Sequence, residues 1–82
     1  MTARSLRPDV RNPLLRLPAT QRLGAVLSQN PAIKVAMAEA LSEISADCRA
    51  AADKAWRTHK PPMAAYWKAQ AVYARHLRLA LR

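Results

Sequence analysis

The chain has 82 residues and a formal net charge of +9 at pH 7, with one glycine, one cysteine and no phenylalanine. Alanine is its commonest residue, and this composition excludes a sheet-rich fold and favours an all-α one. The single cysteine excludes an intramolecular disulfide, and no uninterrupted apolar run reaches the ~20 residues that span a bilayer. Because no apolar leader follows Met1, we expect a small cytoplasmic protein with no integral membrane association.

Residues 1–11 predict a flexible basic arm. This segment, MTARSLRPDVR, has three arginines, one acid and no helical periodicity. Segments of this composition often become ordered only on a partner. We expect the arm to precede a single helical domain over residues 12–82.

Two Asn-Pro pairs predict helix starts, because asparagine caps a helix N-terminus and proline suits the first helical position. Asn12-Pro13 predicts a short helical turn, and the chain from Pro18 onward predicts a helix of about ten residues. The apolar side of that helix consists of Leu23, Val26 and Leu27.

The longest predicted element is a helix over residues 31–59, which Asn30-Pro31 opens and no breaker interrupts before Pro61. Its apolar positions alternate in steps of four and three, the spacing of a packing seam. These seam residues are Met37, Leu41, Ile44, Cys48, Ala51 and Ala55. Since the second half of the seam is small, we expect a neighbouring helix to approach closely there.

Pro61-Pro62 predicts a sharp corner, because proline disfavours the helical conformation of the residue before it. From Pro62 to Arg82 apolar positions again recur at three and four, which predicts a second long amphipathic helix. These positions are Met63, Tyr66, Trp67, Tyr73, Ala74, Leu77 and Leu81. The predicted fold class is therefore all-α: an antiparallel helical hairpin of two long helices plus one or two short N-terminal helices.

Both tryptophans lie in the stretch around the corner, AWRTHKPPMAAYWKA. Trp56 precedes the corner and Trp67 follows it, so we expect both rings to pack at one end of the hairpin against small residues such as Ala55. The alternative is an exposed aromatic interface that contacts a partner or stacks on bases. Its residues would be Trp56, Tyr66 and Trp67.

The positive charge is unevenly distributed along the chain. Residues 54–82 carry seven basic residues and no acid, residues 1–22 carry five arginines and one acid, and residues 23–53 carry four acids and two bases. A field of this sign attracts polyanions, and nucleic acid first. The predicted nucleic-acid-binding residues are Lys60, Lys68, Arg75, Arg78 and Arg82, with Arg4, Arg7 and Arg11 of the arm as supplementary contacts.

The sequence has no motif of an enzyme or a metal site. Glu39, Glu43 and Asp47 form an acidic stripe, which without matching histidines does not define a metal site and is better suited to contacts with basic segments of this chain or of a second subunit. The two histidines are 17 residues apart with no second cysteine to join them. Cys48 falls in the predicted seam, where a free thiol behaves as a small hydrophobe. We expect no catalytic residue, no metal and no cofactor.

The last third of the chain, KAWRTHKPPMAAYWKAQAVYARHLRLALR, resembles short uncharacterised proteins encoded in phages and prophages of proteobacteria. The resemblance carries no known catalytic or binding residue. It implies a context, that of a small accessory protein of a mobile element which acts on nucleic acid or on a host protein.

The sequence as a whole predicts a non-enzymatic accessory protein that binds nucleic acid through a basic helix face. The alternative is a protein-interaction module that inhibits or modulates a host protein, through contact with an acidic surface, since the seam and the aromatic corner suit such a contact. Two further alternatives are a peripheral binder of anionic lipid and a helix-turn-helix protein over residues 20–41. We also expect a homodimer, because the two long helices offer more apolar surface than a short third helix covers.

Overall fold

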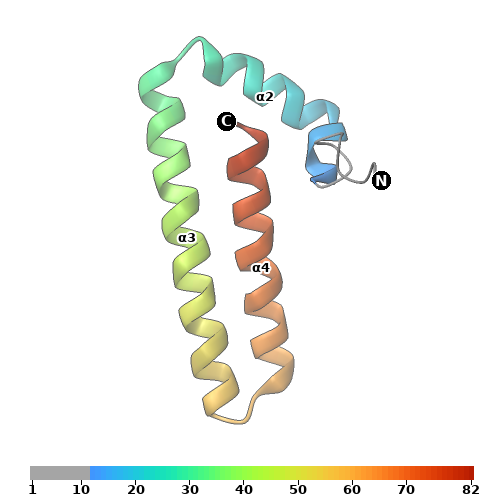
Figure 1. Ribbon diagram of the computed structural model, residues 1–82, viewed down its shortest axis with the longest axis vertical. Helices are drawn as coiled ribbons and strands as arrows, with labels where there is room; N and C mark the ends of the chain where they lie inside the picture. Colours follow the sequence, from blue (N-terminus) through green and yellow to red (C-terminus); the bar gives the residue numbers. More distant parts are fainter. Residues whose placement is uncertain (1–11) are drawn as a thin grey trace, which may run out of the picture.

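The computed structural model describes residues 12–82, which form four helical elements and no strand (Figure 1). The elements are the 3-10 helix η1 (Pro13–Arg16) and the α-helices α2 (Pro18–Ser28), α3 (Pro31–Arg57) and α4 (Pro61–Ala80). The predicted all-α class and helical hairpin are confirmed. The predicted arm, residues 1–11, lies outside the described residues.

The two long helices, α3 and α4, run antiparallel and side by side, and α2 crosses the open end of their hairpin next to the C-terminus (Figure 1). The element η1 contacts α4 on the side away from α3. The predicted boundaries of the long helices are slightly wrong, since α3 ends two residues before His59, and α4 begins one residue before Pro62 and ends two residues before Arg82. All the elements lie in one layer, and the molecule measures 43 × 39 × 19 Å.

The two asparagines that precede prolines have different functions. Asn12 is buried, and its Oδ1 accepts a hydrogen bond from the Leu14 N–H at 3.3 Å, which confirms the predicted cap. Its Nδ2 donates to the carbonyl of His76 at 2.7 Å and so fastens η1 to α4. Asn30 makes no side-chain cap on α3; its Nδ2 instead donates to the carbonyl of Val26 at 2.8 Å, at the end of α2.

The corner between α3 and α4 is a Schellman motif. The N–H of His59 donates to the carbonyl of Trp56 at 3.2 Å, and the N–H of Lys60 donates to the carbonyl of Ala55 at 2.8 Å. His59 has a φ of 61°, the left-handed conformation that this motif requires after a helix C-cap and that glycine usually adopts. The corner therefore imposes on His59 a backbone conformation that disfavours a side chain.

The contact between α3 and α4 consists mainly of small residues. From α3 the buried residues are Ser45, Cys48 and Ala55, and from α4 they are Ala64, Ala71 and Ala74. Ala71 is only 1% exposed, and the Ser45 hydroxyl donates to its carbonyl at 2.9 Å. A side-chain hydroxyl reaches the backbone of a facing helix only when the two helix axes are close, so the small residues allow a tight approach.

The predicted seam is shifted by one position in its middle. Ile44, assigned to the seam, is 47% exposed, while the neighbouring Ser45 is buried. On α4 several predicted apolar positions are likewise exposed rather than buried: Met63, Tyr66 and Tyr73. The physical reason is that serine and alanine permit a closer helix contact than isoleucine or tyrosine, and the bulky side chains then lie on the flanks. On α2, Leu27 is buried whereas Val26 is exposed.

Replacing His59 by glycine is expected to stabilise the protein by about 0.5 to 1 kcal/mol, because glycine adopts the left-handed conformation without a Cβ penalty. Thermal melting should show a Tm higher by a few degrees. In the control His59→Val, the branched Cβ fits this conformation poorly and Tm should fall. An identical Tm for the two variants would contradict the left-handed corner.

Replacing Ala71 by leucine is expected to cost about 1 to 3 kcal/mol, because the new side chain has to separate α3 from α4. The control is Ala65→Leu, at an exposed position of the same helix, which should change stability by less than about 0.5 kcal/mol. Urea denaturation of both variants at one protein concentration measures the difference. Equal midpoints would show that the helices are not in close contact at Ala71.

Candidate nucleic-acid interface

Three arginines surround a shallow hollow in the middle of the hairpin. Arg49 comes from α3, and Arg75 and Arg78 come from α4. The hollow has a volume of about 280 Å³, and the other residues that line it are Ser42, Ser45 and Ala46. Among residues 12–82 no carboxylate lines it, so nothing in the described part of the chain neutralises the three guanidinium groups within the hollow.

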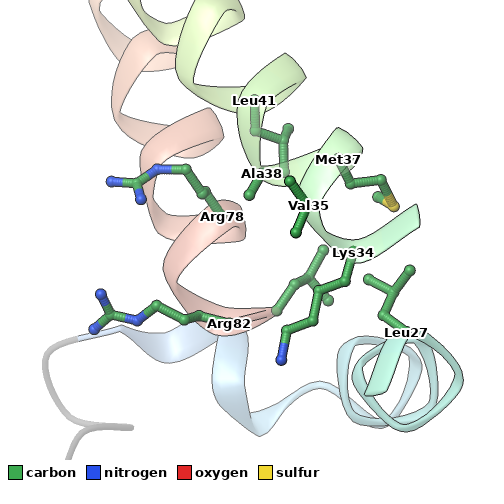
Figure 2. A pocket seen from close by; sticks show the side chains of 9 residues that line it. Leu27, Lys34, Val35, Met37, Ala38, Leu41, Arg78 and Arg82 are labelled. Carbon is green, nitrogen blue, oxygen red and sulfur yellow. The ribbon is translucent and has the colours of Figure 1, made fainter. Parts of the chain in front are cut away.

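A second hollow, of about 170 Å³, lies at the open end of the hairpin below α2. Its wall is apolar, with Leu27 from α2 and Leu41 from α3 among the lining residues, and its charged lining residues are Lys34, Arg78 and Arg82. Figure 2 shows Arg78 and Arg82 extending in the same direction from α4, away from Leu41. This hollow continues the positive charge of the first one, because both include Arg78.

A third hollow, of about 380 Å³, lies at the corner end of the hairpin and is lined by Trp56 of α3 and Lys68 of α4. Trp56 is 67% exposed, so its ring is available for contacts outside the molecule. Asp53 also lines this hollow, and it is the one acid among the residues that line the three hollows. An exposed indole beside a lysine provides both a surface for stacking and a positive charge.

These hollows lie along one face of the hairpin, which we call the basic face. It is formed by Lys34, Arg49, Trp56, Lys68, Arg75, Arg78 and Arg82. Lys68 and Arg75 are seven residues apart, about 10 Å along one side of α4, and Arg82 follows seven residues later, just beyond the end of the helix. Arg78 is half-buried at the helix contact, and Arg75 and Lys68 are exposed.

The remaining residues predicted to bind nucleic acid lie elsewhere. Lys60 is exposed at the N-cap of α4, in the corner, and lines none of the three hollows. The arm residues Arg4, Arg7 and Arg11 fall outside the part of the chain that the structure describes. The structure therefore brings four of the predicted residues onto one face and leaves Lys60 beside it.

Two cations of the basic face, Lys34 and Arg49, are not among the residues predicted from the sequence. Both belong to the segment 23–53, which is acidic overall, so a count of charge along the chain concealed them. The predicted antiparallel hairpin could have indicated them, because residues of α3 and α4 that are equally far from the corner lie side by side. Whether Arg49 faces Arg75 and Arg78 depends on how each helix is rotated about its own axis, which only the tertiary structure shows.

The three aromatic residues of the predicted interface do not form one patch. The rings of Tyr66 and Trp67 contact each other edge to face, with centroids 5.1 Å apart and an angle of 78° between their planes. Trp67 is half-buried, whereas Trp56 is largely exposed. The prediction that both tryptophans pack at the corner is therefore wrong for Trp56, because the small residues Ala55 and Ala64 are the ones buried there.

The cysteine and the acidic side chains considered from the sequence do not form a further site in the described residues. Cys48 is buried in the contact between the helices, as predicted, and the acidic stripe of Glu39, Glu43 and Asp47 is exposed on α3. Within residues 12–82, His, Cys, Asp and Glu side chains form no group of three that could hold a metal ion. Over the same residues, each helix is too short or too polar to cross a membrane.

Comparisons of the chain with protein-family models, with curated proteins and with solved structures found no match.

The two tryptophans are expected to respond differently to truncation. Trp67→Ala should cost about 2 kcal/mol, less than the ~3 to 5 kcal/mol of a fully buried ring, because Trp67 is half-buried. Trp56→Ala should cost less than about 0.5 kcal/mol, because most of its ring already contacts water. Denaturation midpoints of the two variants test this, and equal losses would place Trp56 in the packed corner.

Proposed function

We propose that the protein is a small non-enzymatic accessory protein, of the kind that phages and prophages encode, which binds nucleic acid in the cytoplasm through its basic face. The resemblance of the last third of the chain to short phage and prophage proteins supports the biological context. The net charge of +9 supports attraction to a polyanion.

The observation that carries the proposal is the arrangement of Arg49, Arg75 and Arg78 around a hollow that no carboxylate of the described residues lines. Guanidinium groups bind phosphate oxygens through paired hydrogen bonds, and a phosphate between arginines of two helices receives donors from two sides. A solvated surface of ordinary composition would carry acids among these bases. Here the bases of two separate segments converge without them.

The length of the basic face suits a nucleic-acid backbone. The 20 residues of α4 span about 30 Å, close to one turn of a duplex, and its cations repeat along that length. Contacts of this kind position a protein on the backbone and carry no base identity. We therefore expect affinity to depend weakly on base sequence and steeply on salt.

Trp56 adds a second mode of contact at the corner end of the basic face. Its exposed ring lies beside Lys68 in the corner hollow. An unpaired base stacks on such a ring while its phosphate approaches the ammonium group. This arrangement supports binding of single strands as well as duplexes.

A second candidate function is inhibition or modulation of a host protein with an acidic surface. The specific observation is again Trp56, since exposed tryptophans flanked by basic residues are typical of the few side chains that dominate a protein interface. The same face would be used, with carboxylates of the partner in place of phosphates. Binding to purified nucleic acid distinguishes the two candidates.

The double substitution Arg49→Glu, Arg75→Glu is expected to weaken nucleic-acid binding at least tenfold at about 100 mM salt, because it removes two phosphate contacts and introduces repulsion. The slope of log K against log salt should be about −4 to −5 for the wild type and smaller in magnitude by about 2 for the variant. Fluorescence anisotropy with labelled duplex and single-stranded DNA measures both quantities. Arg78 is left in place because it is half-buried between the helices.

The matched control is Arg22→Glu, Lys54→Glu, which changes the net charge by the same amount at two exposed positions that line none of the three hollows. It should retain most of the affinity. Equal losses in the two double variants would mean that net charge alone determines binding. Failure of the wild type to bind either DNA at tens of micromolar would exclude the nucleic-acid function and favour the host-protein candidate.

A further inference from the structure

The face of the hairpin opposite the basic face is apolar. Ile33 and Ile44 lie three turns apart on the side of α3 away from Arg49, and Tyr66 lies on the side of α4 away from Arg75. We call this surface the apolar face. It is formed by Ile33, Ile44, Met63, Tyr66, Tyr73 and Leu77.

Within residues 12–82 most of the apolar face is uncovered; at its edge Tyr73 lies beside η1, in a hollow that Leu14 and Leu17 also line. Ile33 and Tyr73 are each 55% exposed, and among the described residues no large side chain is fully buried. The helices form a layer only 19 Å thick, whereas a stable domain normally consists of at least two packed layers around a core. The described fold therefore lacks the second layer that would bury these side chains.

We propose that a second copy of the chain packs against the apolar face and forms a two-fold dimer. The five most exposed side chains of this face are each about half exposed, which leaves about 500 Å² of their surface for a partner, on the order of 100 Å² each. Leu77 and the surface around these side chains add to this area, so it exceeds half of the ~800 Å² that each partner of a standard interface buries. An area of this size suits a small dimer interface, at the lower end of the specific ones.

Symmetry and charge favour a second copy over any other occupant. A two-fold dimer uses the same patch on both protomers, so an uncharged apolar patch is complementary to itself. In this dimer the two basic faces lie on opposite outer surfaces, separated by two layers of 19 Å each. That separation exceeds the Debye length of about 8 to 10 Å at physiological salt, so the charge of one protomer hardly opposes the other.

The dimer rests on a surface that the proposed nucleic-acid contact does not use. The test is the molar mass of the purified full chain, measured by light scattering between about 1 and 100 µM, together with the dependence of Tm on protein concentration. We expect the wild type to approach twice the 9.1 kDa of one chain and its Tm to rise with concentration. Ile44→Glu should raise the dissociation constant at least about thirtyfold, with unchanged helical circular dichroism.

The matched control is Val35→Glu, which introduces the same charge at an exposed aliphatic position of α3 outside the apolar face. It should dimerise as the wild type does. A wild type that stays monomeric at 100 µM overturns the proposal, and so does an Ile44→Glu variant that keeps the dimer mass. Binding of a monomeric wild type to vesicles of anionic lipid, lost in Ile44→Glu, would also overturn it and assign the face to a membrane surface.

Discussion

The close contact between α3 and α4 is the constraint on which the rest of the structure depends. Serine, cysteine and alanine occupy the contact, and the hydroxyl of Ser45 reaches the backbone carbonyl of Ala71. Such a contact gains dispersion energy from backbone atoms, but it removes little apolar side-chain area from water. The contact therefore excludes bulky residues from the hairpin, and it leaves residues 12–82 of one chain with a small core.

The exclusion of bulky residues from the contact gives the hairpin two different faces. Isoleucine, methionine and tyrosine side chains that do not fit between the helices lie on one flank, and arginine and lysine side chains lie on the other. The same helix rotation thus produces both the apolar face and the basic face. A substitution that separated the helices would alter both faces together. The proposed nucleic-acid contact and the proposed dimer contact therefore both depend on the stability of the hairpin.

Contacts at the ends of the helices fix the position of α4 along α3. At one end the Schellman motif around His59 turns the chain within three residues, and this short connection limits how far α4 can slide along α3. Towards the other end, Asn12 joins η1 to the carbonyl of His76, and Leu27 of α2 is buried at the open end. These contacts join segments that are far apart in the sequence and account for the position of α2 across the hairpin (Figure 1).

The sequence by itself determined the all-α class, the start of each helix and the corner, because proline, asparagine and the three-four spacing act locally on the backbone. It also determined the positive charge of α4. Only the tertiary structure decided that Ser45 rather than Ile44 enters the contact, and that Arg49 joins Arg75 and Arg78. The reason is that the sequence pattern identifies positions by their hydrophobicity, whereas a close helix contact admits side chains by their size. The small residues allow each helix to rotate about its axis, and that rotation decides which side chains share a face.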